Sequence, residues 1–154
     1  MPVLDFDLKE VLIRPAAIFE FEEIRNLWSA FIKESFPEAT PKPMWWWVQA
    51  EEKAISPNYC IFVPIIPDVG IVGFAESLIV ANPTFGRIER FIGPGYIKPE
   101  FRKTGIHQKL WEIMIEDSKL RGVKTVTSTA YPNMESFWSE FGFILTNRNI
   151  EKDI

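Results

Sequence analysis

The sequence predicts a mixed α/β fold, and three patterns along the chain indicate it. Residues 59–66 and 70–80 are rich in β-branched and aromatic residues, so they read as paired strands. The turn sequence Pro67–Gly70 joins them. Residues 105–121 instead carry apolar residues at helical spacing, and Gly122 is a typical helix stop. The residues expected on the buried face of this helix are Ile106, Leu110, Ile113, Met114 and Leu120.

The long helix determines the relative direction of the strands on either side of it. Residues 87–98 predict the strand before the helix, and residues 123–129 predict the strand after it. A helical crossover makes these two strands parallel, within a sheet that is otherwise antiparallel. Gly93-Pro94-Gly95 interrupts the first of the two strands, and we expect such an insert to form a bulge or a bend.

Shorter patterns predict the remaining elements. Residues 11–14 predict a strand that ends at Pro15, and the helix that follows ends before Pro37. The apolar face of that helix consists of Phe21, Ile24, Leu27, Trp28 and Phe31. Further predicted elements are a second helix at 44–53, a turn at 82–86, a short helix at 133–141, and closing strands at 143–145 and 148–150.

Length and composition indicate one soluble domain. The chain has 154 residues, of which 47% are hydrophobic and 25% charged, so it can bury a core and is not a disordered segment. The single cysteine, Cys60, permits no intramolecular disulfide, and residues 1–10 lack the pattern of a signal peptide. The longest apolar stretch, Cys60–Pro67, is far shorter than the ~20 residues that cross a bilayer. We therefore expect a single cytoplasmic domain, residues 1–154, with no membrane span.

Charge is distributed unevenly along the chain. The formal net charge is −4, which opposes nonspecific binding of nucleic acid. Residues 87–124, however, carry nine basic and five acidic residues. A basic segment in an acidic protein is typical of a local site for a small polyanion, although a solvated charged face gives the same count.

The segment Ile97–Leu110 contains the most informative motif. It leads from a strand through a short basic turn into the long helix, where backbone N–H groups and the helix dipole favour a phosphate. Gly105 lets a ligand approach the backbone closely, and Arg102 and Lys103 add positive charge. The alternative is an ordinary strand-to-helix turn with one glycine.

Two motifs resemble the GNAT family of N-acetyltransferases. Ile97-Lys98-Pro99 with Arg102-Lys103-Thr104-Gly105-Ile106-His107 resembles the coenzyme A loop of that family. Asn133–Phe143 resembles the asparagine, aromatic pair and Gly-Phe of the next helix, and the resemblance extends over residues 71–145. It implies a mainly antiparallel sheet with a central pair of splayed parallel strands and helices on both faces. It also implies transfer of an acetyl group from acetyl-CoA to a primary amine by direct attack in a ternary complex.

The resemblance also implies a cofactor site. The pyrophosphate would lie on the backbone amides of residues 103–108, and the pantetheine arm would insert between the strands that end near residues 98 and 129. An amide near Tyr96 or Ile97 would stabilise the oxyanion. A bulky residue in place of Gly105 is expected to weaken coenzyme binding and leave the fold intact. The residues implied in binding are Tyr96, Ile97, Lys98, Arg102, Lys103, Thr104, Gly105, Ile106, His107, Gln108 and Asn133.

Two positions depart from the family pattern. His107 stands where the family usually has glycine or alanine; its ring could crowd the phosphate, donate a hydrogen bond to it, or have no role. Trp138 stands where many members have the tyrosine that protonates the leaving thiolate, and an indole N–H cannot serve as that acid. Tyr131 and Tyr96 are the substitutes by location, and a thiolate can also leave without enzymatic protonation.

The amine must be neutral to attack, so a carboxylate is expected near it. Glu76 and Glu89 are the candidate bases, because each lies in an apolar strand where an inward-facing carboxylate would be costly without a function. The alternative is that both face solvent. Trp45, Trp46 and Trp47 cannot all be buried on one helix face, so they are candidates for acceptor binding or for a homodimer contact.

Two other functions remain open at this stage. The chain could bind acyl-CoA with little or no transferase activity, as His107 and Trp138 indicate, or it could modify an amine of a nucleobase or nucleic acid, which the net acidity opposes. No metal site is expected. Cys60 is expected to be a buried strand residue rather than a nucleophile, since no histidine motif accompanies it.

Overall fold

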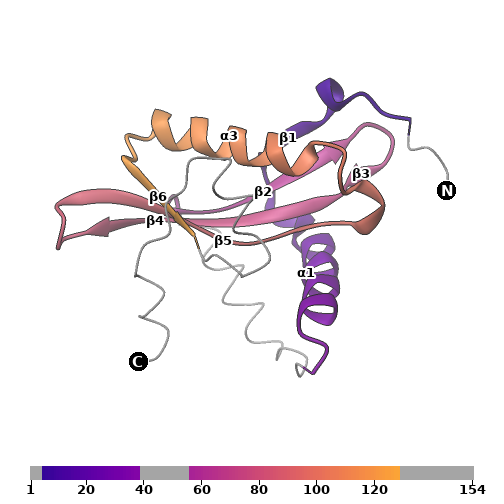
Figure 1. Cartoon of the computed structure of the whole chain (residues 1–154), viewed down its shortest axis with the longest axis horizontal. Coiled ribbons are helices and arrows are strands. Elements are labelled where there is room, and N and C mark those ends of the chain that lie inside the picture. Colours follow the sequence, from indigo (N-terminus) through magenta and orange to yellow (C-terminus); the bar gives the residue numbers. More distant parts are fainter. Residues whose placement is uncertain (1–4, 39–55, 129–154) are drawn as a thin grey trace.

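The computed structural model describes residues 5–38 and 56–128, which form one sheet with a helix on each face (Figure 1). Predicted elements beyond these ranges, namely the helices at 44–53 and 133–141 and the closing strands, lie outside the described residues. The helices are η1 (Leu8–Glu10), η2 (Ile18–Glu20), α1 (Phe21–Ser35), η3 (Pro99–Phe101) and α3 (Ile106–Leu120). The strands are β1 (Leu12–Pro15), β2 (Tyr59–Ile66), β3 (Gly70–Ile71), β4 (Gly73–Asn82), β5 (Arg87–Ile97) and β6 (Thr125–Ser128).

The sheet confirms the predicted mixed α/β class. Its strand order is β1-β2-β4-β5-β6, with β3 paired to β2 beside this path. The pair β5 and β6 is parallel, and the other described pairs are antiparallel. The strand predicted at 70–80 is divided into β3 and β4 at Val72. None of the helices in the two described ranges combines the length and apolarity needed to cross a bilayer.

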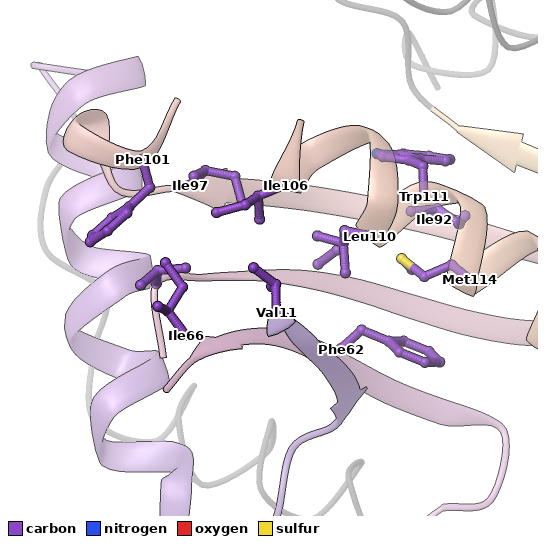
Figure 2. Packing of buried hydrophobic residues seen from close by; sticks show 12 residues of the cluster. Val11, Phe62, Ile66, Ile92, Ile97, Phe101, Ile106, Leu110, Trp111 and Met114 are labelled. Carbon is purple, nitrogen blue, oxygen red and sulfur yellow. The ribbon is translucent and has the colours of Figure 1, made fainter. Parts of the chain in front are cut away.

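Each face of the sheet has its own hydrophobic core. On one face, Ile106, Leu110 and Met114 of α3 cover Val11 and Phe62, as Figure 2 shows. On the other face, α1 packs on β2, β3 and β4. The second core consists of Phe21, Ile24, Leu27, Trp28, Tyr59, Ile61, Val63, Ile71 and Phe74. Phe31, predicted on the same helix face, is only half-buried at its margin.

The predicted buried face of α3 is wrong at two positions. Ile113 and Leu120 are 37% and 88% exposed, whereas Trp111 is only 3% exposed. Successive helical residues are about 100° apart, so the stripe through Leu110 and Met114 extends towards Trp111 and leaves Ile113 and Leu120 beyond its other edge. Apolar spacing predicted the helix correctly, but it did not determine how the helix is rotated on the sheet.

The insert Gly93-Pro94-Gly95 forms the predicted bulge in β5. Ala75 pairs with Gly95, and Ser77 pairs with Ile92, so two steps along β4 face three steps along β5. Proline contributes no backbone N–H to the ladder, which is why bulges accommodate it. The extra residue bends β5 and thereby changes the direction of its last residues, which lead towards the turn before α3.

A buried arginine ties α3 to the sheet. Arg90 of β5 is 1% exposed, and its Nη1 donates hydrogen bonds to Met114 O at 3.1 Å and Ser118 Oγ at 2.8 Å. Its Nη2 lies 2.8 Å from Asp117 Oδ2. Because these partners all lie in the second half of α3, the arginine connects that part of the helix to the parallel strand pair.

The N-terminal segment is fastened to the start of α3. Lys109 Nζ donates to Leu8 O at 2.9 Å and to Val11 O at 2.7 Å. The side chain of Leu8 also lies against Gly105. The first turn of α3 is therefore supported from outside the sheet.

Candidate functional site

The turn before α3 has the backbone geometry of an anion site. Lys103 and Gly105 have φ angles of 61° and 91°, in the left-handed region. Gly105 is the N-cap of α3 and has no side chain to cap the amides of the first turn. Left-handed residues in a turn direct successive N–H groups to one side, and the helix dipole adds a partial positive charge there. This arrangement can bind a phosphate group.

Two structural features favour glycine at position 105. A Cβ at this position would lie 2.9 Å from Leu8 Cδ2, and the positive φ would strain any other residue. The strain at this φ opposes the expectation that a bulky replacement leaves the fold intact, and that expectation stays a prediction. A substitution at Gly105 would perturb the turn and the N-terminal segment together, so it cannot report on ligand binding alone.

The side chains of several predicted loop residues form hydrogen bonds within the protein or are buried in its core. Thr104 Oγ1 donates to Phe101 O at 2.6 Å, and Ile106 is 1% exposed within the core. Gln108 is exposed, and its Nε2 donates to Glu112 Oε1 at 3.0 Å. These residues would contact a ligand through backbone amides, whereas Lys103 has an exposed side chain that can add charge.

Arg102 is held by α1 rather than directed at the turn. Its Nη1 and Nη2 donate to the two carboxylate oxygens of Glu34 at 2.7 and 2.8 Å, and its Nε donates to Ile97 O at 2.9 Å. The hydrogen bond from Arg102 lowers the pKa of the Glu34 carboxyl. Glu34 was not predicted as a site residue, because nothing in the sequence connects two positions 68 residues apart.

The end of β5 presents two different edges. Lys98 N–H donates to Val72 O at 2.9 Å, so the carbonyl of Ile97, in the same peptide unit, points away from β4. In the described residues, β6 pairs with β5 from Glu89 to Ile92, and residues 93–97 lie beyond this pairing. Tyr96 faces α1: its ring lies 6.4 Å from that of Phe31, and the Arg102 guanidinium lies 5.3 Å from it.

The two candidate bases lie on the α1 face of the sheet. Glu76 follows Phe74 by two residues on β4 and is half-buried; it lies opposite the bulge, where a Cβ on Gly93 would be 3.7 Å from Glu76 Cβ. Burial and the neighbouring Glu76 carboxylate raise the pKa of Tyr59. Glu89 is 5% exposed, and its Oε1 accepts from Arg87 Nε at 2.7 Å. The alternative that both carboxylates face solvent is therefore wrong.

His107 is half-buried and paired within its own helix. Its Nε2 accepts a hydrogen bond from Trp111 Nε1 at 3.1 Å, and burial lowers its pKa from 6.5 to about 4. The ring is therefore neutral at pH 7, with its proton on Nδ1. A hydrogen bond from His107 to a phosphate could come only from Nδ1.

The lowered pKa of His107 predicts a pH-dependent stability. The unfolded state binds a proton near pH 6.5 and the folded state only near pH 4, so stability is full above 6.5 and decreases as the pH falls towards 4. The decrease from this group is expected to reach about 3 kcal/mol. His107→Gln, which keeps an acceptor for Trp111 but does not titrate, should remove that part of the decrease. Urea unfolding of both proteins from pH 4 to 7.5 measures this difference. Curves of unfolding free energy against pH that run parallel for the two proteins would contradict the prediction.

Cys60 fits the structural role expected for it. It lies half-buried on β2, and burial raises the pKa of its thiol to about 11. A thiol with such a pKa is protonated at neutral pH, whereas the thiolate is the nucleophilic form. The geometry therefore gives no support to a covalent mechanism at Cys60.

Five predicted site residues and one noted departure fall outside the described residues. Tyr131, Asn133 and Trp138 follow β6, and the tryptophan triplet lies between α1 and β2. Their assignments stay predictions. The residues concerned are Trp45, Trp46, Trp47, Tyr131, Asn133 and Trp138.

Comparison with known proteins identifies the class to which this fold and turn belong. The sequence matches the acetyltransferase (GNAT) domain family over residues 49–154, which is more than half of the chain. The chain therefore belongs to the GNAT family of acetyltransferases. Among curated proteins, none matches the sequence significantly.

Three solved structures illustrate the shared fold. A transcriptional regulator from Bacillus halodurans superposes with a TM-score of 0.76 at 22% identity, covering 89% of this chain and 95% of the other. A predicted acetyltransferase from Clostridium acetobutylicum, solved with acetyl-CoA, gives 0.73 at 15% identity, covering 89% and 92%. An aminoglycoside acetyltransferase from an uncultured soil metagenomic sample, solved with sisomicin, gives 0.70 at 16% identity, covering 87% and 86%. At these identities the likeness shows the fold alone.

Proposed function

We propose that this chain transfers an acetyl group from acetyl-CoA to a primary amine by direct attack in a ternary complex. One observation carries the proposal: the turn at the start of α3 has two residues with positive φ, Lys103 and Gly105, and only the short helix η3 separates it from the bulged strand β5. That turn suits a pyrophosphate, and the end of β5 suits the extended arm attached to it. Membership of the GNAT family supports the same reaction class.

The proposed cofactor site runs from the turn to the bulge. Backbone amides of residues 103–108 would hold the pyrophosphate, and Lys103 would add a positive charge. The pantetheine arm would lie along the edge of β5 to which the carbonyl of Ile97 points. Gly93 and Gly95 have no side chains, so this part of the strand lets the arm approach the backbone closely. Asn133 is proposed as a further contact.

The proposed chemistry needs a base and an oxyanion donor. Glu76 is the better base, because it lies across from the bulge, whereas Glu89 is buried beside Arg87. Glu76 would accept the proton of the attacking amine directly or through water. For the oxyanion, Ile97 is the better donor, since backbone alternation directs its amide to the same edge as its carbonyl and away from β4.

The proton donor and the acceptor site complete the proposal. Burial raises the pKa of Tyr96, so its hydroxyl stays protonated at neutral pH and can donate a proton to the departing thiolate. Tyr131 is the other proposed donor. Trp45, Trp46 and Trp47 are proposed to form the wall against which the amine acceptor binds.

The proposal is tested by coenzyme A calorimetry together with a thiol-release assay on a panel of amines. The panel should include an aminoglycoside such as sisomicin, because a protein of similar fold was solved with it, as well as a polyamine, an α-amino acid and a lysine peptide. We expect coenzyme A binding and turnover with at least one amine. Binding without turnover on any of them would instead support an acyl-CoA-binding module.

A variant of the turn controls for the binding position. Lys103→Asn removes one positive charge at a residue whose φ of 61° asparagine tolerates well. It should weaken coenzyme A binding while leaving the melting temperature unchanged. Failure of the unaltered chain to bind coenzyme A at all would contradict the proposed function.

A further inference from the structure

Glu34 and Arg102 form a two-point ion pair between the end of α1 and the turn before α3. The two N–O distances are 2.7 and 2.8 Å, each to a different carboxylate oxygen. The side chains are 38% exposed for Arg102 and 47% for Glu34. Figure 1 shows α1 below the end of the sheet at which β5 turns into α3. The pair therefore connects the end of α1 with the turn before α3, which are 68 positions apart in the sequence.

The remaining guanidinium nitrogen of Arg102, Nε, donates a hydrogen bond to a backbone carbonyl. Its Nε donates to Ile97 O at 2.9 Å, and that carbonyl points away from β4. This is the edge along which the pantetheine arm is proposed to lie. The guanidinium also lies 5.3 Å from the Tyr96 ring, so carboxylate, carbonyl and aromatic ring together fix its position.

A carboxylate and a phosphate compete for the same guanidinium. Both are recognised through two parallel N–H···O bonds, so Arg102 cannot satisfy Glu34 and a pyrophosphate with the same two nitrogens. Holding Arg102 against α1 thus opposes coenzyme binding, because the two nitrogens that Glu34 occupies are not available to a phosphate.

We propose that Glu34 is a positioning residue of the acetyl-CoA site, which restrains Arg102 and thereby limits the affinity for coenzyme A. The inference rests on the proposed function, because it needs a phosphate at the turn. When Glu34 is neutralised, Arg102 is released from α1, the carbonyl of Ile97 becomes open to the arm, and the guanidinium can turn to the phosphate. An exposed ion pair contributes little to folding, so the fold should tolerate the change.

The test is isothermal calorimetry with coenzyme A on Glu34→Gln at low ionic strength. We expect the affinity to rise about two- to fivefold, the range that exposed ion pairs produce. Glu22→Gln is the matched control, because Glu22 is an exposed carboxylate in the first turn of the same helix, and it should leave the affinity unchanged. Arg102→Gln combined with Glu34→Gln should show no gain over Arg102→Gln alone.

The outcomes separate this inference from the proposed function. An unchanged or lower affinity in Glu34→Gln, in a protein that otherwise binds coenzyme A, would overturn the inference alone, since a merely structural pair gives that result. A gain that persists without Arg102 would also overturn it, because the charge would then act without the arginine. No binding by the unaltered chain would overturn both. Matching melting temperatures for Glu34→Gln and Glu22→Gln would support the inference, by showing that a gain in affinity does not arise from altered folding.

Discussion

Replacing Arg90 with alanine is expected to lower the free energy of unfolding by about 3 kcal/mol. The arginine is 1% exposed and supplies donors to Met114 O, Ser118 Oγ and the Asp117 carboxylate. Alanine would remove the hydrogen bonds that Arg90 donates and leave a cavity between β5 and α3. The expected loss is moderate for a buried pair, because Asp117 is 26% exposed and also accepts from Arg121.

Arg90→Met is the matched control for the alanine variant. Methionine removes the same hydrogen bonds as alanine, but it fills much of the volume of the arginine side chain and therefore leaves a smaller cavity. Chemical denaturation should therefore rank Arg90→Met clearly above Arg90→Ala. Equal stability of Arg90→Ala and the unaltered chain would show that the buried pair contributes nothing to the fold.

Replacing Glu76 with glutamine is expected to lower kcat by about 10²- to 10⁴-fold, as the loss of a general base does. The amide keeps the shape of the side chain but cannot take a proton from the amine. Coenzyme A affinity should not change, because Glu76 lies on β4 and not in the turn before α3.

Glu89→Gln distinguishes the two candidate carboxylates. It breaks the contact with Arg87 and is expected to reduce stability, but kcat should stay within a few-fold of the unaltered value. Steady-state kinetics with the acceptor found in the amine panel makes the comparison. If Glu89→Gln lost the activity and Glu76→Gln kept it, the assignment of the base would have to be reversed.

Local sequence signals predicted the elements of the fold well. Residues 59–66 were predicted as a strand, and β2 has the same bounds, because a run of β-branched and aromatic residues is a property of the segment itself. The bulge in β5 was predictable because proline and glycine restrict pairing wherever they stand in a strand. The parallel pairing of β5 and β6 was predictable because a helix connects the two strands as a crossover.

Features that depend on distant partners could not be predicted. From the sequence alone, Arg90 would be expected at the surface, because its partner Asp117 lies on another element, α3. The rotation of α3 was missed because Ile113 and Trp111 are both apolar, and only the shape of the sheet selects between them. Within the site, the motif located the turn, but it gave no sign that α1 would hold Arg102 through Glu34.

The contact between Lys109 and residues 8–11 affects the order in which the molecule can be completed during synthesis. Residues 8–11 leave the ribosome before the ammonium group that binds them, which lies about a hundred positions later in the sequence. At roughly 5–20 residues per second, that delay is on the order of 5–20 seconds. During this time Leu8 has no helix to cover, and contacts of such large sequence separation form slowly. The contact that supports the turn before α3 can thus form only after Lys109 has been synthesised.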